Sequence, residues 1–188
     1  MPMNLLHRKL CSSKKWAADV AERMPGMLAG VELGDDVLEI GPGFGATTRV
    51  LATRVERLTA VEIDPESVRL LRAEFGERVE IVRGDGARMP FPERHFSAVV
   101  CFTMLHHVPS PAQQDALFAE AYRVLRPGGV FRGVDSQPNP GFRLLHVGDT
   151  MVTLDPHTLP DRLRGAGFVD IETDHQPGRR ISFLARRT

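Results

Sequence analysis

The sequence has few cysteines, no net charge and no long hydrophobic run. Two cysteines, Cys11 and Cys101, lie far apart among 188 residues, which gives no disulfide framework and no zinc-ligand pattern and leaves a single disulfide open. The 24 acidic and 24 basic residues cancel, so no global field would recruit nucleic acid. No segment approaches the roughly 20 apolar residues of a membrane span, and residues 5–9 lack the apolar core of a signal peptide. These absences favour a cytoplasmic protein without a membrane span.

The composition that remains is typical of a globular domain. Apolar residues make up 42% and charged residues 26% of the chain, and a chain of this length can bury one sizeable core. We therefore expect a single domain over residues 1–188. Its expected parts are a helical cap over 1–35, a ligand-binding half over 36–135, and a substrate-side loop with a terminal hairpin over 136–188.

Short apolar runs alternate with helical segments from residue 36 onward. The expected strands are 37–40, 58–63, 79–82, 97–102 and 130–134, with helices over 47–54, from Pro65 onward and over 113–125. Asp64 is expected to cap the helix that begins with Pro65. Two further strands, 168–173 and 181–185, have no helix between them and should pair as a hairpin. The pattern predicts an α/β fold with one doubly wound, mostly parallel, seven-stranded sheet and helices on both faces.

Two segments outside this alternation are expected to cover a ligand or pack at the domain edge. Trp16, Val20 and Met24 recur at helical spacing, which predicts an amphipathic helix that ends near Pro25-Gly26. Residues 136–156 are irregular and rich in proline and glycine, and such a stretch inside a compact domain is usually a functional loop.

The most informative stretch is a glycine turn between the first strand and its helix. Glycines at positions 41, 43 and 45 follow the apolar run 37–40. Glycine tolerates positive φ and lets a ligand approach the bare backbone. With Ala46, the turn satisfies the loose pattern G-x-G-x-x-G/A of dinucleotide sites. The turn therefore predicts a nucleotide-like ligand at a helix N-terminus, with a simple tight turn as the structural alternative.

Two neighbouring residues narrow the choice of ligand. Pro42 has no N–H and removes one donor from a loop that would cradle a diphosphate. The carboxylate of Glu39, expected at the loop entrance, would repel a diphosphate and attract an ammonium group. Both residues favour a ligand with a nucleoside and a positive charge but no phosphate, a description that S-adenosylmethionine fits.

The carboxyl ends of the other strands supply further candidate residues, because ligands of open α/β sheets lie at the carboxyl ends of the strands. The expected ends are 39–45, Glu62, Asp85-Gly86, 102–107 and Asp135. Glu62 lies 21 residues after Gly41, near the spacing of the acid that holds ribose hydroxyls in dinucleotide folds. A carboxylate accepts from two vicinal hydroxyls at once, and each such bond contributes roughly 1.5–3 kcal/mol.

Three motifs resemble those of class I S-adenosylmethionine-dependent methyltransferases: the glycine turn with its strand, the run 84–87 followed by Met89-Pro90-Phe91, and the turn 125–129. The likeness covers about residues 36–186. It implies a Rossmann-like methyltransferase fold with an antiparallel last strand, S-adenosylmethionine as cofactor, and a small organic or lipid-like acceptor.

The resemblance also implies where the cofactor binds. Asp85 would accept a hydrogen bond from the adenine amino group, and the Gly86 N–H would donate to the neighbouring ring nitrogen. The implied cofactor-binding residues are Glu39, Gly41, Pro42, Gly43, Gly45, Glu62, Ile63, Asp85, Gly86 and Phe102.

Methyl transfer from a sulfonium needs alignment and exclusion of water more than a dedicated acid or base. For a hydroxyl acceptor a base would help, and His106 or His107, with His107 ahead, is the candidate general base or substrate contact. The alternative is that both histidines are polar loop residues. We expect no metal here, because adjacent histidines on an extended segment point opposite ways. Further ligands would have to come from distant residues: Asp135, His146, Asp155 or His157.

Three alternative functions remain open. An NAD(P)-dependent Rossmann oxidoreductase shares the glycine turn and Glu62, but Glu39, Pro42 and the terminal hairpin disfavour it. A non-catalytic S-adenosylmethionine-binding module would have the same cofactor half. A nucleic-acid methyltransferase is disfavoured by the zero net charge and by the absence of an Asn-Pro-Pro-Tyr-like stretch after the fourth strand.

Overall fold

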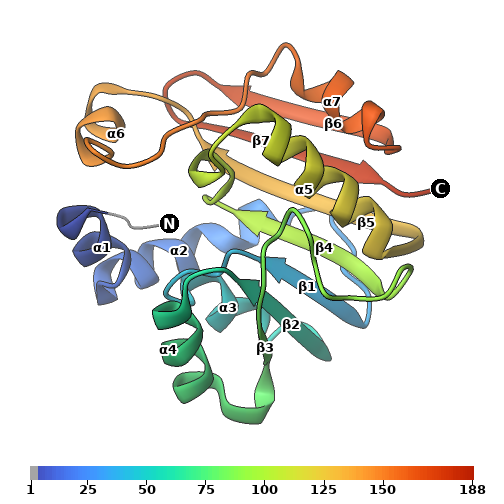
Figure 1. Ribbon diagram of the computed structural model, residues 1–188, viewed down its shortest axis with the longest axis horizontal. Coiled ribbons are helices and arrows are strands. Elements are labelled where there is room, and N and C mark those ends of the chain that lie inside the picture. The colour runs from blue at the N-terminus through green and yellow to red at the C-terminus, as the bar shows by residue number, and fades with distance from the viewer. Residues whose placement is uncertain (1–3) are drawn as a thin grey trace.

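The structure, a computed structural model, describes residues 4–188 and contains one seven-stranded sheet flanked by helices (Figure 1). The strands are β1 (Asp36–Ile40), β2 (Arg57–Glu62), β3 (Glu80–Arg83), β4 (Phe96–Phe102), β5 (Leu125–Ser136), β6 (Val169–Gln176) and β7 (Arg180–Arg186). Their order across the sheet is β3-β2-β1-β4-β5-β7-β6. Strands β1 to β5 pair in parallel, whereas β7 runs antiparallel to β5 and to β6. The expected sheet, its antiparallel last strand and its terminal hairpin are confirmed.

Helices precede the sheet and connect its strands. They are α1 (Leu5–Cys11), α2 (Lys14–Met27), α3 (Ala46–Leu51), α4 (Pro65–Phe75), α5 (Pro111–Val124), α6 (Pro140–Leu145) and α7 (Leu159–Gly165), with 3₁₀ turns η1 (Gly76–Arg78) and η2 (Leu105–His107). Helices α1 and α6 lie at the end of the sheet toward which the arrows of β1 and β4 point (Figure 1). Among residues 4–188, none of the helices has the length and apolar character that crossing a bilayer requires.

The central strands are buried on both faces, which explains their unbroken apolar runs. Leu38 and Ile40 of β1 belong to a core cluster shared with α5 and α7, whereas Val37 belongs to a second cluster shared with α2, α3 and α4. Alternate side chains of one strand therefore enter opposite cores. The two helical layers hold the sheet rigid from both sides, so the positions of its strand ends are fixed.

Local signals in the sequence set several helix ends. The Asp64 carboxylate accepts hydrogen bonds from the backbone N–H groups of Glu66 and Ser67, and Pro65 is the first residue of α4. This predicted cap is confirmed. Helix α2 continues through Pro25 and ends at Met27, one residue after Gly26, so the expected end near Pro25-Gly26 is confirmed. Proline lacks only one hydrogen bond there, and burial of Met24 and Met27 supports the last turn.

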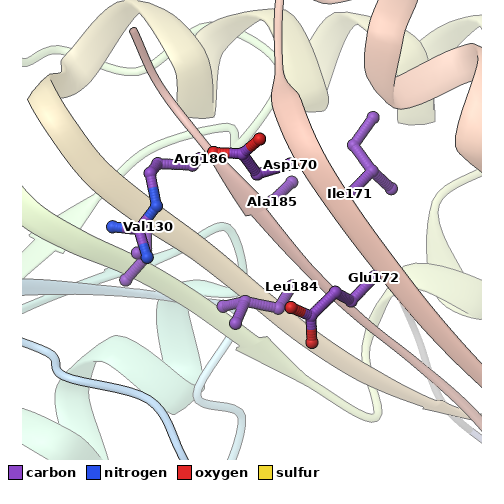
Figure 2. Close-up of a pocket in the computed structure, with 7 residues that line it drawn as sticks. All are labelled: Val130, Asp170, Ile171, Glu172, Leu184, Ala185 and Arg186. Carbon is purple, nitrogen blue, oxygen red and sulfur yellow. The ribbon is translucent and has the colours of Figure 1, made fainter.

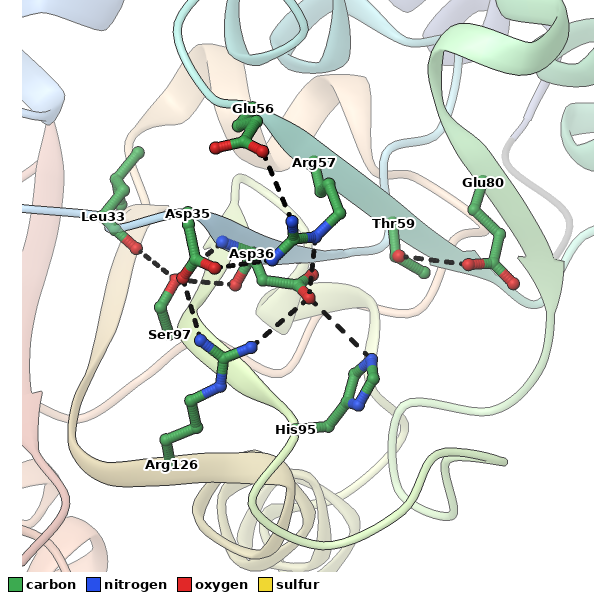
Figure 3. A network of polar contacts seen from close by, with 10 residues as sticks. All are labelled: Leu33, Asp35, Asp36, Glu56, Arg57, Thr59, Glu80, His95, Ser97 and Arg126. Carbon is green, nitrogen blue, oxygen red and sulfur yellow. Dashed lines mark hydrogen bonds and ion pairs between the residues drawn. The ribbon is translucent and has the colours of Figure 1, made fainter.

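The amino ends of the strands form an edge of ion pairs and hydrogen bonds (Figure 3). The Asp36 carboxylate lies 3.2 Å from Nε of Arg57 and 3.5 Å from Nη2 of Arg126. The Ser97 hydroxyl donates to the carbonyl oxygen of Leu33 (2.7 Å) and accepts from the N–H of Asp36 (2.9 Å). Since these groups satisfy one another, their contacts have a structural role at this edge.

Candidate functional site

The glycine turn lies at the carboxyl end of β1 in the expected conformation. Gly41, Gly43 and Gly45 have φ values of 67°, 55° and 76°. A Cβ at Gly41 would lie 2.9 Å from Cε of Met104, and one at Gly45 would lie 2.9 Å from Cδ2 of Leu71. A Cβ at Gly43 would meet nothing within 4 Å. Two of the glycines therefore permit close packing, whereas Gly43 borders open space beside the turn.

Glu62 connects the glycine turn to the end of β2. It is buried, and its Oε2 accepts a hydrogen bond from the Gly43 N–H at 2.9 Å. Its Oε1 accepts from the Asp64 N–H, also at 2.9 Å. The next residue, Ile63, leaves half of its apolar side chain exposed at the same edge. An acid and an apolar surface thus lie next to the bare backbone of Gly43.

Glu39 lies beneath the turn rather than at its entrance. Its side chain is fully buried and accepts hydrogen bonds from the hydroxyls of Thr47 and, at 2.6 Å, Thr48 in the first turn of α3. Burial raises the pKa of Glu39 to about 7; the two hydroxyls oppose this shift, and the nearby Glu62 carboxylate adds to it. These two threonines were not identified from the sequence as partners of Glu39. Their hydroxyls lie eight and nine residues after an acid at a strand end, and this spacing could have indicated the contact.

The third strand end contributes Asp85 and Gly86. Asp85 is exposed, and its Oδ1 accepts from the Ala87 N–H at 2.9 Å. A Cβ at Gly86 would lie 2.9 Å from Cγ2 of Ile40 and 3.0 Å from Cδ1 of Leu117. The loop after β3 therefore packs against the last residue of β1, so the ends of β1, β2 and β3 form one continuous edge.

Pro42 and Phe102 are two further candidates with little access to solvent. Both are buried. Phe102, at the end of β4, packs in the core cluster shared with α2, α3 and α4. The Thr103 residue that follows has φ of 52°, an uncommon conformation for a residue with a Cβ. Strain of this kind is concentrated at functional positions.

His106 and His107 lie on η2, directly after β4. Nδ1 of His106 lies 2.6 Å from Oδ1 of Asp135, and the His106 backbone N–H donates to Oδ2 of the same carboxylate at 2.8 Å. Both side chains of this pair are almost fully buried. Burial, followed by repulsion from neighbouring imidazoles, lowers the pKa of His107 to about 2. The His107 imidazole is therefore neutral and a weak proton acceptor, and the geometry favours His106 as the base.

The expectation that the two histidines point in opposite directions on an extended segment is wrong. They lie on a 3₁₀ turn, and their ring centroids are 4.1 Å apart. Two more histidines from distant parts of the chain join them, His7 of α1 and His146 directly after α6. Sequence reasoning missed His7 and placed His146 too far away. No local pattern brings together residues so distant in the sequence.

Cys11 and Cys101 are both free thiols. Cys101 is buried in β4, and burial raises its pKa well above the ordinary value. Cys101 therefore serves as a small core side chain.

A hollow of about 460 Å³ lies elsewhere, between β5, β6 and β7 (Figure 2). It is lined by Val130, Asp170, Ile171, Glu172, Leu184, Ala185 and Arg186. Val130 pairs with Ala98 near the amino end of β4, so the hollow is distant from the carboxyl edge. It coincides with the irregular register between Val169 and Glu172 rather than with the glycine turn.

Comparison with known proteins gives a family match over the cofactor half. A family model described as a methyltransferase domain matches residues 38–132, which is half of the chain. A probable S-adenosylmethionine-dependent methyltransferase of Mycolicibacterium smegmatis is 38% identical over 106 residues, covering 56% of this chain and 39% of the relative. A fatty-acid O-methyltransferase of the same organism is 33% identical over 108 residues, covering 56% of this chain and 38% of the relative.

A ribosomal RNA small subunit methyltransferase A of an Anaeromyxobacter species is 42% identical over 66 residues, covering 35% of this chain and 23% of the relative. These matches span less than two-fifths of the relatives' lengths. Among solved structures, a methyltransferase from Archaeoglobus fulgidus has a TM-score of 0.73 at 15% identity, with 93% of this chain and 95% of the other covered. This last likeness concerns the fold alone.

Proposed function

The chain belongs to the methyltransferase domain family, and from this premise we propose that it transfers a methyl group from S-adenosylmethionine to a small organic or lipid-like acceptor. The cofactor occupies the carboxyl edge of β1, β2 and β3. The single observation that carries the proposal is the open space at Gly43, whose N–H is bonded to the buried Glu62 carboxylate.

Each group at this edge suits one part of the cofactor. The Glu62 carboxylate accepts from the two ribose hydroxyls, and the half-exposed Ile63 side chain packs against the adenine ring. Asp85 and Gly86 bind the polar edge of the adenine. Glu39 acts from below the turn, where it holds Thr47 and Thr48 at the start of α3.

The reaction is an in-line displacement at the methyl carbon. The bond between sulfur and methyl breaks as the acceptor atom bonds the methyl group, and the sulfonium leaves as a neutral thioether. Alignment of donor and acceptor lowers such a barrier by roughly 7–11 kcal/mol without a dedicated base. The chain's main task is therefore to position the two reactants and to exclude water.

The apolar surface beside the carboxyl edge favours a lipid-like acceptor. Four large apolar side chains of α1, α6 and the segment after α6 are between 64% and 87% exposed; they are Leu5, Leu6, Leu144 and Val147. The Asn4 side chain donates to the carbonyl oxygens of Leu145 (2.7 Å) and Val147 (3.1 Å), so these two regions adjoin. Exposed apolar groups gathered in this way mark a binding surface for apolar ligands.

A ribosomal RNA acceptor is the weaker alternative. Three relatives named as ribosomal RNA small subunit methyltransferases align over 60 to 94 residues, compared with 106 and 108 residues for the two Mycolicibacterium smegmatis relatives. RNA binding depends on neutralising phosphates with basic side chains, whereas the charges of this chain cancel. The NAD(P)-dependent alternative is disfavoured by the family match.

If the acceptor is a hydroxyl, His106 is the proposed proton acceptor, since Asp135 orients its ring. His107 is then a neighbour of the acceptor rather than a base. Turnover of His106→Ala with an identified hydroxyl acceptor is expected to fall by about 10²–10⁴-fold. A rate equal to that of the unmodified protein would remove this role.

Calorimetry separates the proposed function from its alternatives. S-adenosylmethionine is expected to bind and NAD is expected not to bind. Glu62→Ala should weaken S-adenosylmethionine binding by roughly 1–3 kcal/mol, whereas Glu77→Ala, an exposed acid on η1, should leave it unchanged. Binding of NAD alone, or equal affinities in both variants, would contradict the proposal. Methyl transfer to apolar acceptors, measured with a radiolabelled methyl group, separates an enzyme from a non-catalytic module.

A further inference from the structure

Three histidines from separate parts of the chain converge beside the proposed acceptor side. His7 comes from α1, His107 from η2, and His146 follows α6. Each offers one ring nitrogen, and these three nitrogens lie within 4.8 Å of one another. His7 and His146 are each only 4% exposed. His107 is partly buried, so the three rings form a cluster that is largely shielded from solvent.

The opposite side of two of these rings is already engaged. Nδ1 of His7 donates to Oδ2 of Asp149 at 2.8 Å, and the Asp149 side chain is almost fully buried. Nδ1 of His146 donates to the carbonyl oxygen of Phe142 at 2.8 Å. Metal-binding histidines are typically held in this way, since a carboxylate or carbonyl on one nitrogen fixes the tautomer and orients the other nitrogen toward the ion.

The nitrogen that remains on His146 has no partner among the described residues. Its Nε2 is buried and makes no hydrogen bond within residues 4–188. A buried polar atom without a hydrogen-bond partner costs about 1–3 kcal/mol. A metal ion bound between the rings contacts this nitrogen and removes that cost.

A side chain from α5 holds the segments next to the cluster in place. The Gln114 amide donates to the carbonyl oxygens of Leu105 (3.0 Å) and Val152 (2.8 Å).

We propose that His7, His107 and His146 bind one divalent transition-metal ion of the zinc type. Imidazole ligands suit Zn²⁺, Cu²⁺ and Ni²⁺ and not Mg²⁺ or Ca²⁺, which prefer oxygen. Tetrahedral zinc with Zn–N bonds of about 2.0–2.1 Å needs nitrogens about 3.3 Å apart, so binding draws the three rings together. Three protein ligands leave one coordination position for another molecule, as in catalytic zinc sites.

The ion connects three segments that lie far apart in the sequence. It joins the N-terminal helix and the segment between β5 and α7 to the end of β4. Its role in presenting the acceptor rests on the proposed function, because the open coordination position would belong to the acceptor side. Metal binding itself does not rest on that function, and the two are tested separately.

The test uses the full chain after removal of metal by a chelator. Titration with Zn²⁺ in a calorimeter is expected to give one ion per chain. Co²⁺ is expected to produce the visible absorption of a tetrahedral cobalt site. His146→Ala and His7→Ala should each lower Zn²⁺ affinity by 100-fold or more. Asp149→Asn, which replaces the carboxylate on the far side of the His7 ring, should lower it by about 10–100-fold.

Matched controls separate this site from adventitious binding. His157→Ala and His175→Ala remove exposed histidines outside the cluster and should leave affinity and stoichiometry unchanged. Circular dichroism and S-adenosylmethionine calorimetry on the same samples show whether each variant folds. For the unmodified chain, one equivalent of Zn²⁺ should raise the melting temperature, which tests the site even where a variant fails to fold.

Two outcomes overturn the proposal. One is an unmodified chain that binds neither Zn²⁺ nor Co²⁺ stoichiometrically and does not gain thermal stability from them. The other is a folded His7, His146 double variant that binds the ion as tightly as the unmodified chain. Failure of S-adenosylmethionine binding with intact metal binding would instead reject the proposed function and leave the metal site standing.

Discussion

The glycine turn and the histidine cluster lie at the same edge of the sheet but are built in opposite ways. The turn and its partners come from two short segments, 39–48 and 62–64, which adjacent parallel strands bring together. The cluster joins His7 to Asp149, 142 positions apart, and depends on helices outside the sheet. The sheet therefore fixes the turn, whereas hydrogen bonds between segments outside the sheet fix the cluster. The predictions below test this difference.

The largest expected effect concerns the buried carboxyl of the turn. Glu39 has a pKa raised from its ordinary 4.5 to about 7, so the folded protein holds a proton that the unfolded chain releases. The stabilisation is complete below about pH 4.5 and is lost as pH rises through 7, a change on the order of 3 kcal/mol. Denaturant unfolding of Glu39→Gln should lack this loss between pH 5 and 8. An identical pH slope in both proteins would contradict the burial argument.

Next in size is the effect of filling the open space at the turn. Gly43→Val should weaken S-adenosylmethionine binding by roughly 1–3 kcal/mol, because its side chain occupies the ligand's place. Gly76→Val is the matched control, since Gly76 also has a positive φ of 56° and nothing within 4 Å of its Cβ position. Both variants should lose similar stability, but only Gly43→Val should lose affinity. Equal affinities measured by calorimetry would move the ligand away from the turn.

The smallest effect should be confined to the acceptor side. The Asn4 side chain caps α1 and bonds the carbonyl oxygens of Leu145 and Val147. Asn4→Ala should cost about 1 kcal/mol and raise hydrogen exchange in α1 and α6. Exchange in the glycine turn should not change. Faster exchange in both regions would mean that the two sides of the site are one cooperative unit.

A feature is predictable from the sequence when the residues that form it lie close together along the chain. The alternation of strands and helices, the Asp64 cap and the glycine turn all depend on such neighbours, and each is present in the structure. The hydroxyls that hold Glu39 are nearly as local but have a weaker pattern. His7 and His146 have no local pattern, because helix docking brings them to η2.

The arginines near the C-terminus also include a long-range contact that the sequence does not predict. Because no acidic residue lies close to them in the sequence, they are expected to form a solvated strand edge. Arg187 is instead buried, and its Nη1 donates to the carbonyl oxygens of Tyr122, Arg123 and Leu125 at the end of α5. Those carbonyls lack partners within their own helix. An arginine 62 positions after Leu125 satisfies them, and no periodicity in the sequence indicates that contact.

The most direct test of the account is a hydrogen-exchange footprint of the chain with and without S-adenosylmethionine. Saturating cofactor should slow exchange in three separate segments, 39–47, 62–65 and 84–88, and leave β6 and β7 unchanged. Protection confined to the hollow between β5, β6 and β7, or absent from the glycine turn, would contradict the placement of the cofactor at the carboxyl edge.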